Sequence, residues 1–306
     1  MAPGPRIALA GATGGLGPTV VAEFVANGLH VTLLTRKGGS GAKGSTTSEL
    51  LDIKEVDYEN IAEVTKALHG VDVFISTVGN PGLDAQIQLI DAAVAAGVKR
   101  FLPSEFGAEA EHPRQKDFPL YVTKRRIVDY LAKKAAEHPS FSYTRVVTHA
   151  FFDWGISESF LVDRAAHHMV RYNGGNTPFS VTTLKTIATA LVFISKNLEA
   201  TKNRAVFVHD AAITQNQLAR LAQEADGIEW TFEEQSTKQL LQDSLDELRK
   251  LKPDVGKAMR GFTTVAVYDA DHDPDLTGRV DNEMMGIPIM GDREVADVIK
   301  KAMAKV

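Results

Sequence analysis

The segment Gly11–Gly17 is the first stretch whose residue types and spacing could bind a ligand. It reads GATGGLG and directly follows the apolar run RIALA. Glycines at this spacing let the backbone turn sharply, approach a pyrophosphate and bring the next helix close to the strand. The N–H groups and positive dipole end of that helix then face the phosphates. We predict a dinucleotide site that includes Gly11, Thr13, Gly14, Gly15, Leu16 and Gly17. A tight turn without a ligand is the alternative.

The end of the second apolar run indicates which dinucleotide binds. A site that prefers NAD usually has an Asp or Glu there, which binds the ribose 2′-hydroxyl. This sequence has Thr35, Arg36 and Lys37 instead. An Arg can bind a 2′-phosphate through two parallel hydrogen bonds and stack on adenine. The sequence therefore predicts NADPH, held by Arg36 and Lys37. The alternative is a basic loop exposed to solvent.

Small and polar residues follow two later apolar runs. The first is VDVFIS, which leads into Thr77, Val78 and Gly79, and the second is VKRFLP, which leads into Ser104. Ligands of open α/β sheets bind beyond the carboxyl ends of the strands. We therefore predict that these four residues contact the cofactor. After Ser104, we expect Glu105 to bond nearby backbone N–H groups and Phe106 to form a wall of the nicotinamide pocket.

Hydride transfer needs a proton donor, and one helix offers candidates. Short-chain dehydrogenases use Tyr and Lys at the spacing YxxxK, whereas this chain has Tyr121 and Lys124, one residue closer. Residues three apart remain neighbours on a helix. A Lys that acts near neutral pH needs a pKa lowered by burial or by a nearby cation such as Arg125. The spacing makes Tyr121 and Lys124 candidate catalytic residues, and we also predict Lys124 as a cofactor-binding residue that could hold the nicotinamide ribose by hydrogen bonds. The alternative for Lys124 is a surface lysine.

The segment after the sixth apolar run is rich in ring-bearing side chains. His149 could bond a substrate oxygen or be a core histidine. Phe151, Phe152 and Trp154 could line an aromatic pocket or pack in the core. We assign Phe106, His149 and Phe152 to the substrate site. Adjacent histidines at 167–168 point apart on a helix and have no spaced carboxylate partner, so we expect no metal site.

Alternating apolar and helical patterns predict the elements that position these residues. Strands are expected over 6–12, 30–36, 51–58, 71–79, 98–104 and 141–149, and helices over 18–27, 60–70, 83–97 and 119–137. Asp117 is a candidate N-cap, and a Gly/Ser-rich loop spans 37–49. This alternation predicts an α/β fold, a Rossmann-type doubly wound parallel sheet. We place an NADP-binding domain at 1–150. A smaller mixed α/β substrate-binding domain is placed at 151–306, with some segments returning to the sheet.

Composition excludes several classes of protein. The 306 residues are 44% apolar and 24% charged, as in soluble globular proteins, and the net charge of −5 gives no reason to expect nucleic acid or a membrane as a partner. There are no cysteines, which excludes disulfides and thiolate metal sites. No apolar run reaches the roughly 18 residues of a membrane span. We expect a cytoplasmic protein and leave its oligomeric state open.

The motifs GATGGLG and RFLPSEFG, with a Lys on the helix after the next loop, resemble the isoflavone reductase-like group of atypical short-chain dehydrogenases. This group, which includes phenylcoumaran benzylic ether and pinoresinol-lariciresinol reductases, belongs to the wider NmrA-like family. The resemblance implies NADPH-dependent reduction of an aromatic small molecule, a ketone, enone, imine or benzylic ether, with Lys124 as the proton-transfer group. It also leaves open an NADP(H)-binding regulatory protein that senses redox state without turnover.

Overall fold

The computed structural model describes residues 4–38, 48–115 and 118–304. These residues form two compact units between which the chain passes several times. Unit 1 consists of Met1–Phe106, Thr123–Val146 and Ile187–Val206, and unit 2 consists of Gly107–Val122, Val147–Thr186 and Phe207–Val306. Two predicted features, residues 39–47 of the Gly/Ser-rich loop and the N-cap Asp117, lie outside the described residues.

A seven-stranded sheet forms the centre of unit 1, with the order β10-β6-β5-β4-β1-β2-β3. From β3 to β6 this is the Rossmann order 3-2-1-4-5-6. The pairs β1–β2, β2–β3, β1–β4, β4–β5 and β5–β6 are parallel. The strands are β1 Ile7–Ala10, β2 Val31–Arg36, β3 Leu51–Val56, β4 Val73–Ser76, β5 Arg100–Leu102, β6 Ser142–Val147 and β10 Arg204–Phe207. The predicted α/β fold class is confirmed.

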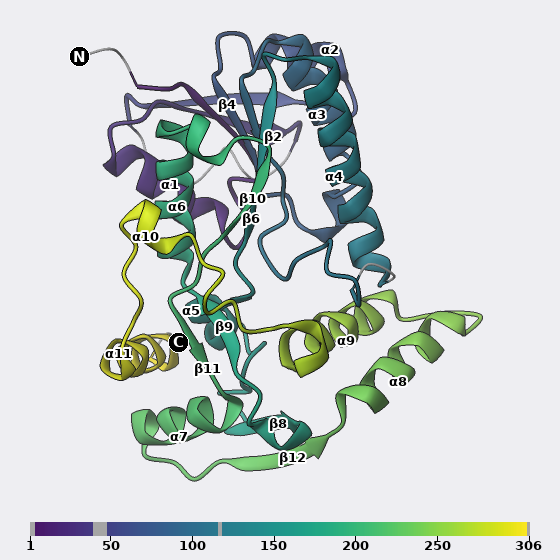
Figure 1. Cartoon of the computed structure of the whole chain (residues 1–306), viewed down its shortest axis with the longest axis vertical. Coiled ribbons are helices and arrows are strands. Elements are labelled where there is room, and N and C mark those ends of the chain that lie inside the picture. Colours follow the sequence, from purple (N-terminus) through teal and green to yellow (C-terminus); the bar gives the residue numbers. More distant parts are fainter. Residues whose placement is uncertain (1–3, 39–47, 116–117, 305–306) are drawn as a thin grey trace. The chain divides into compact units, whose positions relative to one another are not determined.

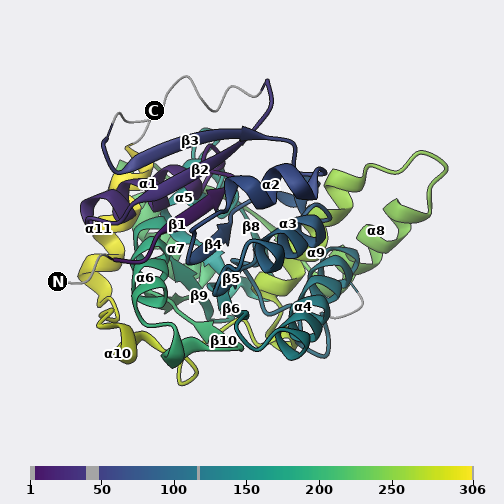
Figure 2. The same ribbon diagram turned by 90° about the horizontal axis from the view of Figure 1, so that it is seen from above.

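Helices cover both faces of this sheet, which explains why its central strands are continuous apolar runs rather than alternating ones. Figure 2 shows α1 (Gly17–Ala26) and α6 (Leu184–Lys196) on one face, and α2 (Ile61–Ala67), α3 (Gln86–Ala95) and α4 (Pro119–Glu137) on the other. Every residue of β1 and β4 is buried, whereas the edge strand β3 is largely exposed. Helices α1 and α3 are followed by Gly28 and Gly97 at positive φ, the usual conformation of a glycine that ends a helix.

Unit 2 contains two small sheets packed with helices. Strand β9 (Phe179–Thr182) lies between β7 (Ala150–Phe151) and β11 (Ala211–Ile213), and β8 (His168–Tyr172) pairs in parallel with β12 (Thr231–Gln235). The helices are α5 Phe152–Ser157, α7 Gln215–Asp226, α8 Thr237–Arg249, α9 Val255–Tyr268, α10 Asn282–Met285 and α11 Asp292–Met303. Helices α8 and α9 run side by side (Figure 1). Short 3₁₀ turns span Asn80–Gly82 in unit 1, Glu199–Thr201 in unit 1, and Asn173–Gly175 and Ala270–His272 in unit 2.

The sequence NRAVFVHD (203–210) also has the apolar pattern of a strand, but only part of it is extended. Its first part is β10 of the seven-stranded sheet, and β11 of unit 2 begins after it at Ala211. The predicted domain boundary at residue 150 lies close to Val146–Val147, where the chain passes from unit 1 to unit 2. The excursion of residues 107–122 into unit 2 has no counterpart in the sequence pattern, because it depends on contacts with distant residues. None of the helices among the described residues is long and apolar enough to cross a membrane.

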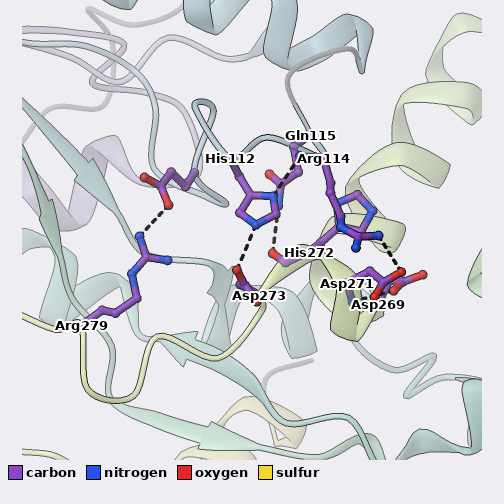
Figure 3. A network of polar contacts seen from close by, with 9 residues as sticks. His112, Arg114, Gln115, Asp269, Asp271, His272, Asp273 and Arg279 are labelled. Carbon is purple, nitrogen blue, oxygen red and sulfur yellow. Dashed lines mark hydrogen bonds and ion pairs between the residues drawn. The ribbon is translucent and has the colours of Figure 1, made fainter.

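In unit 2, polar contacts fasten the loop after Phe106 to the acidic segment DADHDPD (269–275) and the residues that follow it (Figure 3). His112 Nε2 lies 3.0 Å from Asp273 Oδ2, and Arg114 Nη1 lies 2.8 Å from Asp271 Oδ2. Gln115 donates to the backbone oxygen of His272, and Arg279 pairs with Glu109. The acidic segment therefore holds this loop in place through charged and polar contacts.

Candidate cofactor site and active site

The glycine loop joins β1 to α1 within unit 1. Gly11 has φ +87°, and a Cβ atom there would lie 2.6 Å from the backbone C and O atoms of Thr77. A Cβ on Gly17 would lie 2.4 Å from the backbone oxygen of Gly11. Both positions therefore require glycine, one for the turn beside β4 and one for the close packing of α1 on the loop. Thr13, Gly14 and Gly15 are exposed at the tip of the loop.

The beginning of α1 is open to an anion. Its N-cap is Leu16, which gives no side-chain hydrogen bond to the first turn, and Pro18 follows within that turn. The first N–H groups of a helix need acceptors from elsewhere, and a phosphate is a suitable one. The exposed loop tip and the uncapped helix end are both what a pyrophosphate site requires. The residues present therefore fit a dinucleotide cofactor.

Thr77 connects the carboxyl end of β4 to the glycine loop. Its N–H donates to Ala10 O at 2.8 Å, and its hydroxyl lies 3.0 Å from Ala10 O and 3.1 Å from Gly11 O. Val78 is buried, whereas Gly79 is exposed. Thr77 therefore fixes the backbone on which a cofactor would lie.

Arg36 and Lys37 end β2 in different electrostatic settings. Both are exposed, but Lys37 Nζ lies 2.8 Å from a carboxylate oxygen of Glu63, on α2. The hydrogen bond to Glu63 raises the pKa of Lys37. Behind the end of β2, the Tyr58 hydroxyl donates to Leu34 O at 2.7 Å, and burial raises its pKa. Of these two residues, Arg36 is thus the one that is more available to a phosphate.

Ser104 connects the carboxyl ends of β4 and β5. Its hydroxyl donates to Val78 O at 2.7 Å, and its N–H donates to Gln86 Oε1 at 2.7 Å. Gln86 lies at the start of α3 and is completely buried. Ser104 is partly exposed, and its hydroxyl oxygen keeps a lone pair that can accept a hydrogen bond. The position fits both a structural role and contact with a ligand.

Lys124 is buried, with 9% of its surface exposed. Its Nζ donates to the backbone oxygen of Glu105 at 2.5 Å. Burial lowers the pKa of Lys124, while the Glu105 carboxylate opposes this shift. Lys124 shares a small hollow of unit 1 with Gln86, Ser104 and Glu105. The surface-lysine interpretation is therefore wrong, because the ammonium group lies inside the unit beside the ends of β4 and β5.

The carboxylate of Glu105 faces a cation. Glu105 Oε1 lies 3.4 Å from Arg145 Nη1 of β6, and both side chains are buried. The ion pair joins the loop after β5 to β6, and a partner 40 residues away cannot be read from local sequence. Bonds from Glu105 to nearby backbone N–H groups stay a prediction.

Tyr121 belongs to an apolar cluster of unit 2. The cluster includes Phe118, Phe262 and Val265, and the ring centroids of Tyr121 and Phe118 lie 6.3 Å apart. The side chain of Tyr121 is 2% exposed. Its surroundings are those of a core tyrosine, whereas those of Lys124 in unit 1 are polar.

His149 follows β6 in unit 2 with an unusual backbone. Its φ is +53°, its N–H donates to Gly107 O at 3.0 Å, and its side chain is buried. Burial, followed by the charge of Arg279, lowers the pKa of His149 to about 3. The imidazole is neutral at physiological pH, so it can donate or accept a hydrogen bond but cannot supply a proton as an acid.

The aromatic residues predicted for the substrate site differ in exposure. Phe152 is completely buried in the main core of unit 2, with Ile156 and Phe179, and offers no accessible surface. Phe151 and Trp154 are partly exposed and pack edge to face with centroids 6.0 Å apart. Phe106, the last residue of this segment of unit 1, is also partly exposed.

Two residues that contact this site, Gln86 and Arg145, are not predicted from the sequence. Gln86 looks like an ordinary polar residue in an Ala-rich helix, and Arg145 looks like the outward-facing position of an alternating strand. A single cation in a short strand is a weak signal of a buried ion pair, because such a side chain is usually exposed. Their importance follows only from the distances to Ser104 and Glu105.

The parallel sheet, together with the glycine cradle (the loop of residues 11–17 at the carboxyl end of β1), defines a Rossmann-type dinucleotide-binding protein. The model of the NmrA-like family matches residues 4–271, and the chain belongs to this family. The resemblance seen in the sequence is thereby confirmed.

Relatives are found in fungi and plants. Oxidoreductase aprR of Aspergillus flavus is 29% identical over 300 residues, covering 96% of this chain and 99% of that protein. Phenylcoumaran benzylic ether reductase PT1 of Pinus taeda is 31% identical over 157 residues, which cover 48% of this chain and 49% of that protein. These names agree with the prediction of an oxidoreductase.

Solved structures with the same fold include complexes with the predicted cofactor. The binary complex of leucoanthocyanidin reductase with NADPH from Vitis vinifera has a TM-score of 0.75 at 18% identity, covering 98% of this chain and 100% of that one. The structure described as AtPrR2 with NADP+ and (+)pinoresinol has a TM-score of 0.72 at 20% identity, covering 99% and 100%. At these identities the likeness shows the fold alone.

Proposed function

We propose that this protein is an NADPH-dependent reductase of an aromatic small molecule, with Lys124 as the proton-transfer group. The observation that carries the proposal is the buried ammonium group of Lys124, which lies beside Ser104 where β4 and β5 end. The glycine cradle occupies the same edge of the same sheet. The reductase names of the relatives and the NADPH in one solved complex support this proposal.

Residues of unit 1 would hold the cofactor. The glycine loop and the uncapped start of α1 suit the pyrophosphate, and Arg36 suits a 2′-phosphate. Thr77, Val78 and Gly79 provide backbone and small side chains that allow a ring to pass closely. Lys37 contributes less, because Glu63 already neutralises it. When bound, NADPH supplies the hydride.

Lys124 would supply the proton that accompanies the hydride. Hydride transfer to carbon leaves a negative charge on the carbonyl or enone oxygen, the imine nitrogen or the departing ether oxygen, and one N–H proton of Lys124 neutralises it. Burial makes the ammonium group a stronger acid than an exposed lysine. The hydrogen bond to Glu105 O holds Nζ in place before the transfer.

The substrate residues are proposed from each unit by itself, and in unit 1 Phe106 is partly exposed. The partly exposed Phe151 and Trp154 suit an aromatic ring, and the neutral imidazole of His149 suits a hydrogen bond to a substrate oxygen. The pinoresinol and benzylic ether in the descriptions of the neighbours support an aromatic substrate class. The roles of Tyr121 and Phe152 stay predictions, which Tyr121→Phe and Phe152→Leu would test.

The test is an NADPH-oxidation screen against aromatic ketones, enones, imines and benzylic ethers. Lys124→Ala should lower kcat by at least about 100-fold, the usual range for loss of a general acid. Lys133→Ala is the matched control, because Lys133 is on the same helix but is well exposed. Near-normal turnover by Lys124→Ala would refute the role of Lys124. NADPH binding without turnover of any candidate would instead favour a redox-sensing regulator.

A further inference from the structure

Three buried residues of unit 1 form a connected polar group around the proposed proton donor. Lys124 Nζ donates to the backbone oxygen of Glu105 at 2.5 Å, and the carboxylate of the same Glu105 lies 3.4 Å from Arg145 Nη1. Glu105 and Arg145 are 3% and 6% exposed. Glu105 therefore touches Lys124 through its backbone and Arg145 through its side chain.

We infer that Glu105 and Arg145 are positioning residues whose buried charge pair governs how tightly Lys124 holds its proton. This inference rests on the proposed function of Lys124. The two residues have separate effects, because the Glu105 carbonyl fixes the position of Nζ and the Glu105 carboxylate acts through its charge. Arg145 acts on Glu105, whose carboxylate it approaches to 3.4 Å.

The charges around Lys124 support this inference. The Glu105 carboxylate favours the charged ammonium group, whereas burial disfavours it. The other described residues that line the hollow are uncharged: Gln86, Pro103, Ser104, Ile127 and Val128. On α4 itself, Arg126 pairs with Asp84, and Arg125 is partly exposed. Glu105 and Arg145 are thus two buried charges of the described part of unit 1 that can adjust Lys124.

The sign of each effect follows from electrostatics. Removing the Glu105 charge takes away an anion that favours the charged form of Lys124, so the ammonium group should release its proton at lower pH. Removing the Arg145 charge takes away a cation that lies 3.4 Å from the Glu105 carboxylate and partly offsets its charge, so the ammonium group should be retained to higher pH. A role limited to packing would not shift the two variants in opposite directions.

The experiment measures the titration of Lys124 directly, by NMR of protein labelled with ¹³C-lysine, with Lys124→Met used to assign the signal. Glu105→Gln keeps the carbonyl and the side-chain shape, and should lower the midpoint by about one pH unit. Arg145→Gln should raise it by about one pH unit. Arg145→Lys keeps a cation and should restore most of the midpoint of the unaltered protein.

The same variants are then compared in turnover. The high-pH limb of the kcat profile, where a general acid loses its proton, should move in the same directions as the NMR midpoint. If Arg145→Gln does not fold, the double variant Glu105→Gln/Arg145→Gln is compared with Glu105→Gln instead. The double variant should have a higher Lys124 midpoint than Glu105→Gln, because it also lacks the Arg145 cation. Midpoints that do not move, or that move together, overturn the inference. Opposite NMR shifts with an unchanged kcat profile would support the charge pair and refute Lys124 as the proton donor.

Discussion

The ammonium group of Lys37 lies 2.8 Å from the carboxylate of Glu63, whereas the adjacent Arg36 forms no ion pair within the part of the chain that the structure describes. The two cations at the end of β2 are therefore not equivalent, although they look so in the sequence. A phosphate that binds Lys37 must compete with Glu63. A phosphate that binds Arg36 has no such competitor.

Arg36→Ala should weaken NADPH binding selectively. A hydrogen bond between charged groups contributes about 1.5–3 kcal/mol, so the dissociation constant for NADPH should rise about tenfold or more. NADH lacks the 2′-phosphate and should bind the variant as it binds the unaltered protein. Titration of cofactor fluorescence measures both constants. Lys37→Ala should have the smaller effect, and an equal loss for NADPH and NADH in Arg36→Ala would contradict the assignment.

Gly11→Ala should disrupt the cofactor cradle. The new Cβ would lie 2.6 Å from the Thr77 backbone, so the glycine loop and the end of β4 must move apart. Gly28→Ala is the matched control, because Gly28 also has positive φ but a Cβ added there would meet no atom within 4 Å. In both variants the left-handed backbone costs about 1 kcal/mol. Gly11→Ala should in addition lose most NADPH affinity, and equal affinities for the two variants would argue against a cradle at this loop.

The local features of the fold were predictable, and the long-range ones were not. The glycine loop and the parallel strands follow from apolar runs and glycine spacing, which act over a few residues. Lys124 was identified through its resemblance to a family motif. The pairing of Glu105 with Arg145 and of Ser104 with Gln86 depends on strands and helices that meet only in the folded unit. No periodicity indicates such partners, and the same reason hides the passage of residues 107–122 into unit 2.

Arg100 should stabilise unit 1 without affecting the cofactor site. It is completely buried at the start of β5, where its guanidinium donates to Ser142, Thr144, Thr201 and the backbone oxygen of Leu198. Burial lowers its pKa to about 10. Arg100→Met should remove these hydrogen bonds and lower the free energy of unfolding by about 3 kcal/mol, measured in urea.

The adjacent Lys99 provides the control for Arg100. Lys99 is 62% exposed and pairs with Asp72 on the surface at 2.8 Å. Such a pair contributes about 0–1 kcal/mol, so Lys99→Met should change stability little. The folded fraction of Arg100→Met should still bind NADPH normally, because Arg100 lies at the opposite end of β5 from Ser104. Similar losses in the two variants would refute a special role for the buried guanidinium.

His149 should make the protein less stable in acid. Its pKa in the folded protein is about 3, below the value of about 6.5 in the unfolded chain. The unfolded state therefore binds one more proton between these values, and the stability contributed by the neutral imidazole is complete above pH 6.5 and is lost as the pH falls towards 3. The loss reaches about 2 kcal/mol at pH 5.

His149→Asn should remove this component and still accept the positive φ, because Asn tolerates the left-handed region. Urea unfolding of both proteins at several pH values provides the measurement. His209 and His272, whose pKa values burial also lowers, are present in both proteins and cancel in the difference. The stability difference should therefore shift in favour of His149→Asn as the pH falls from 7 to 5, and a difference that is independent of pH would show that His149 is not buried in its neutral form.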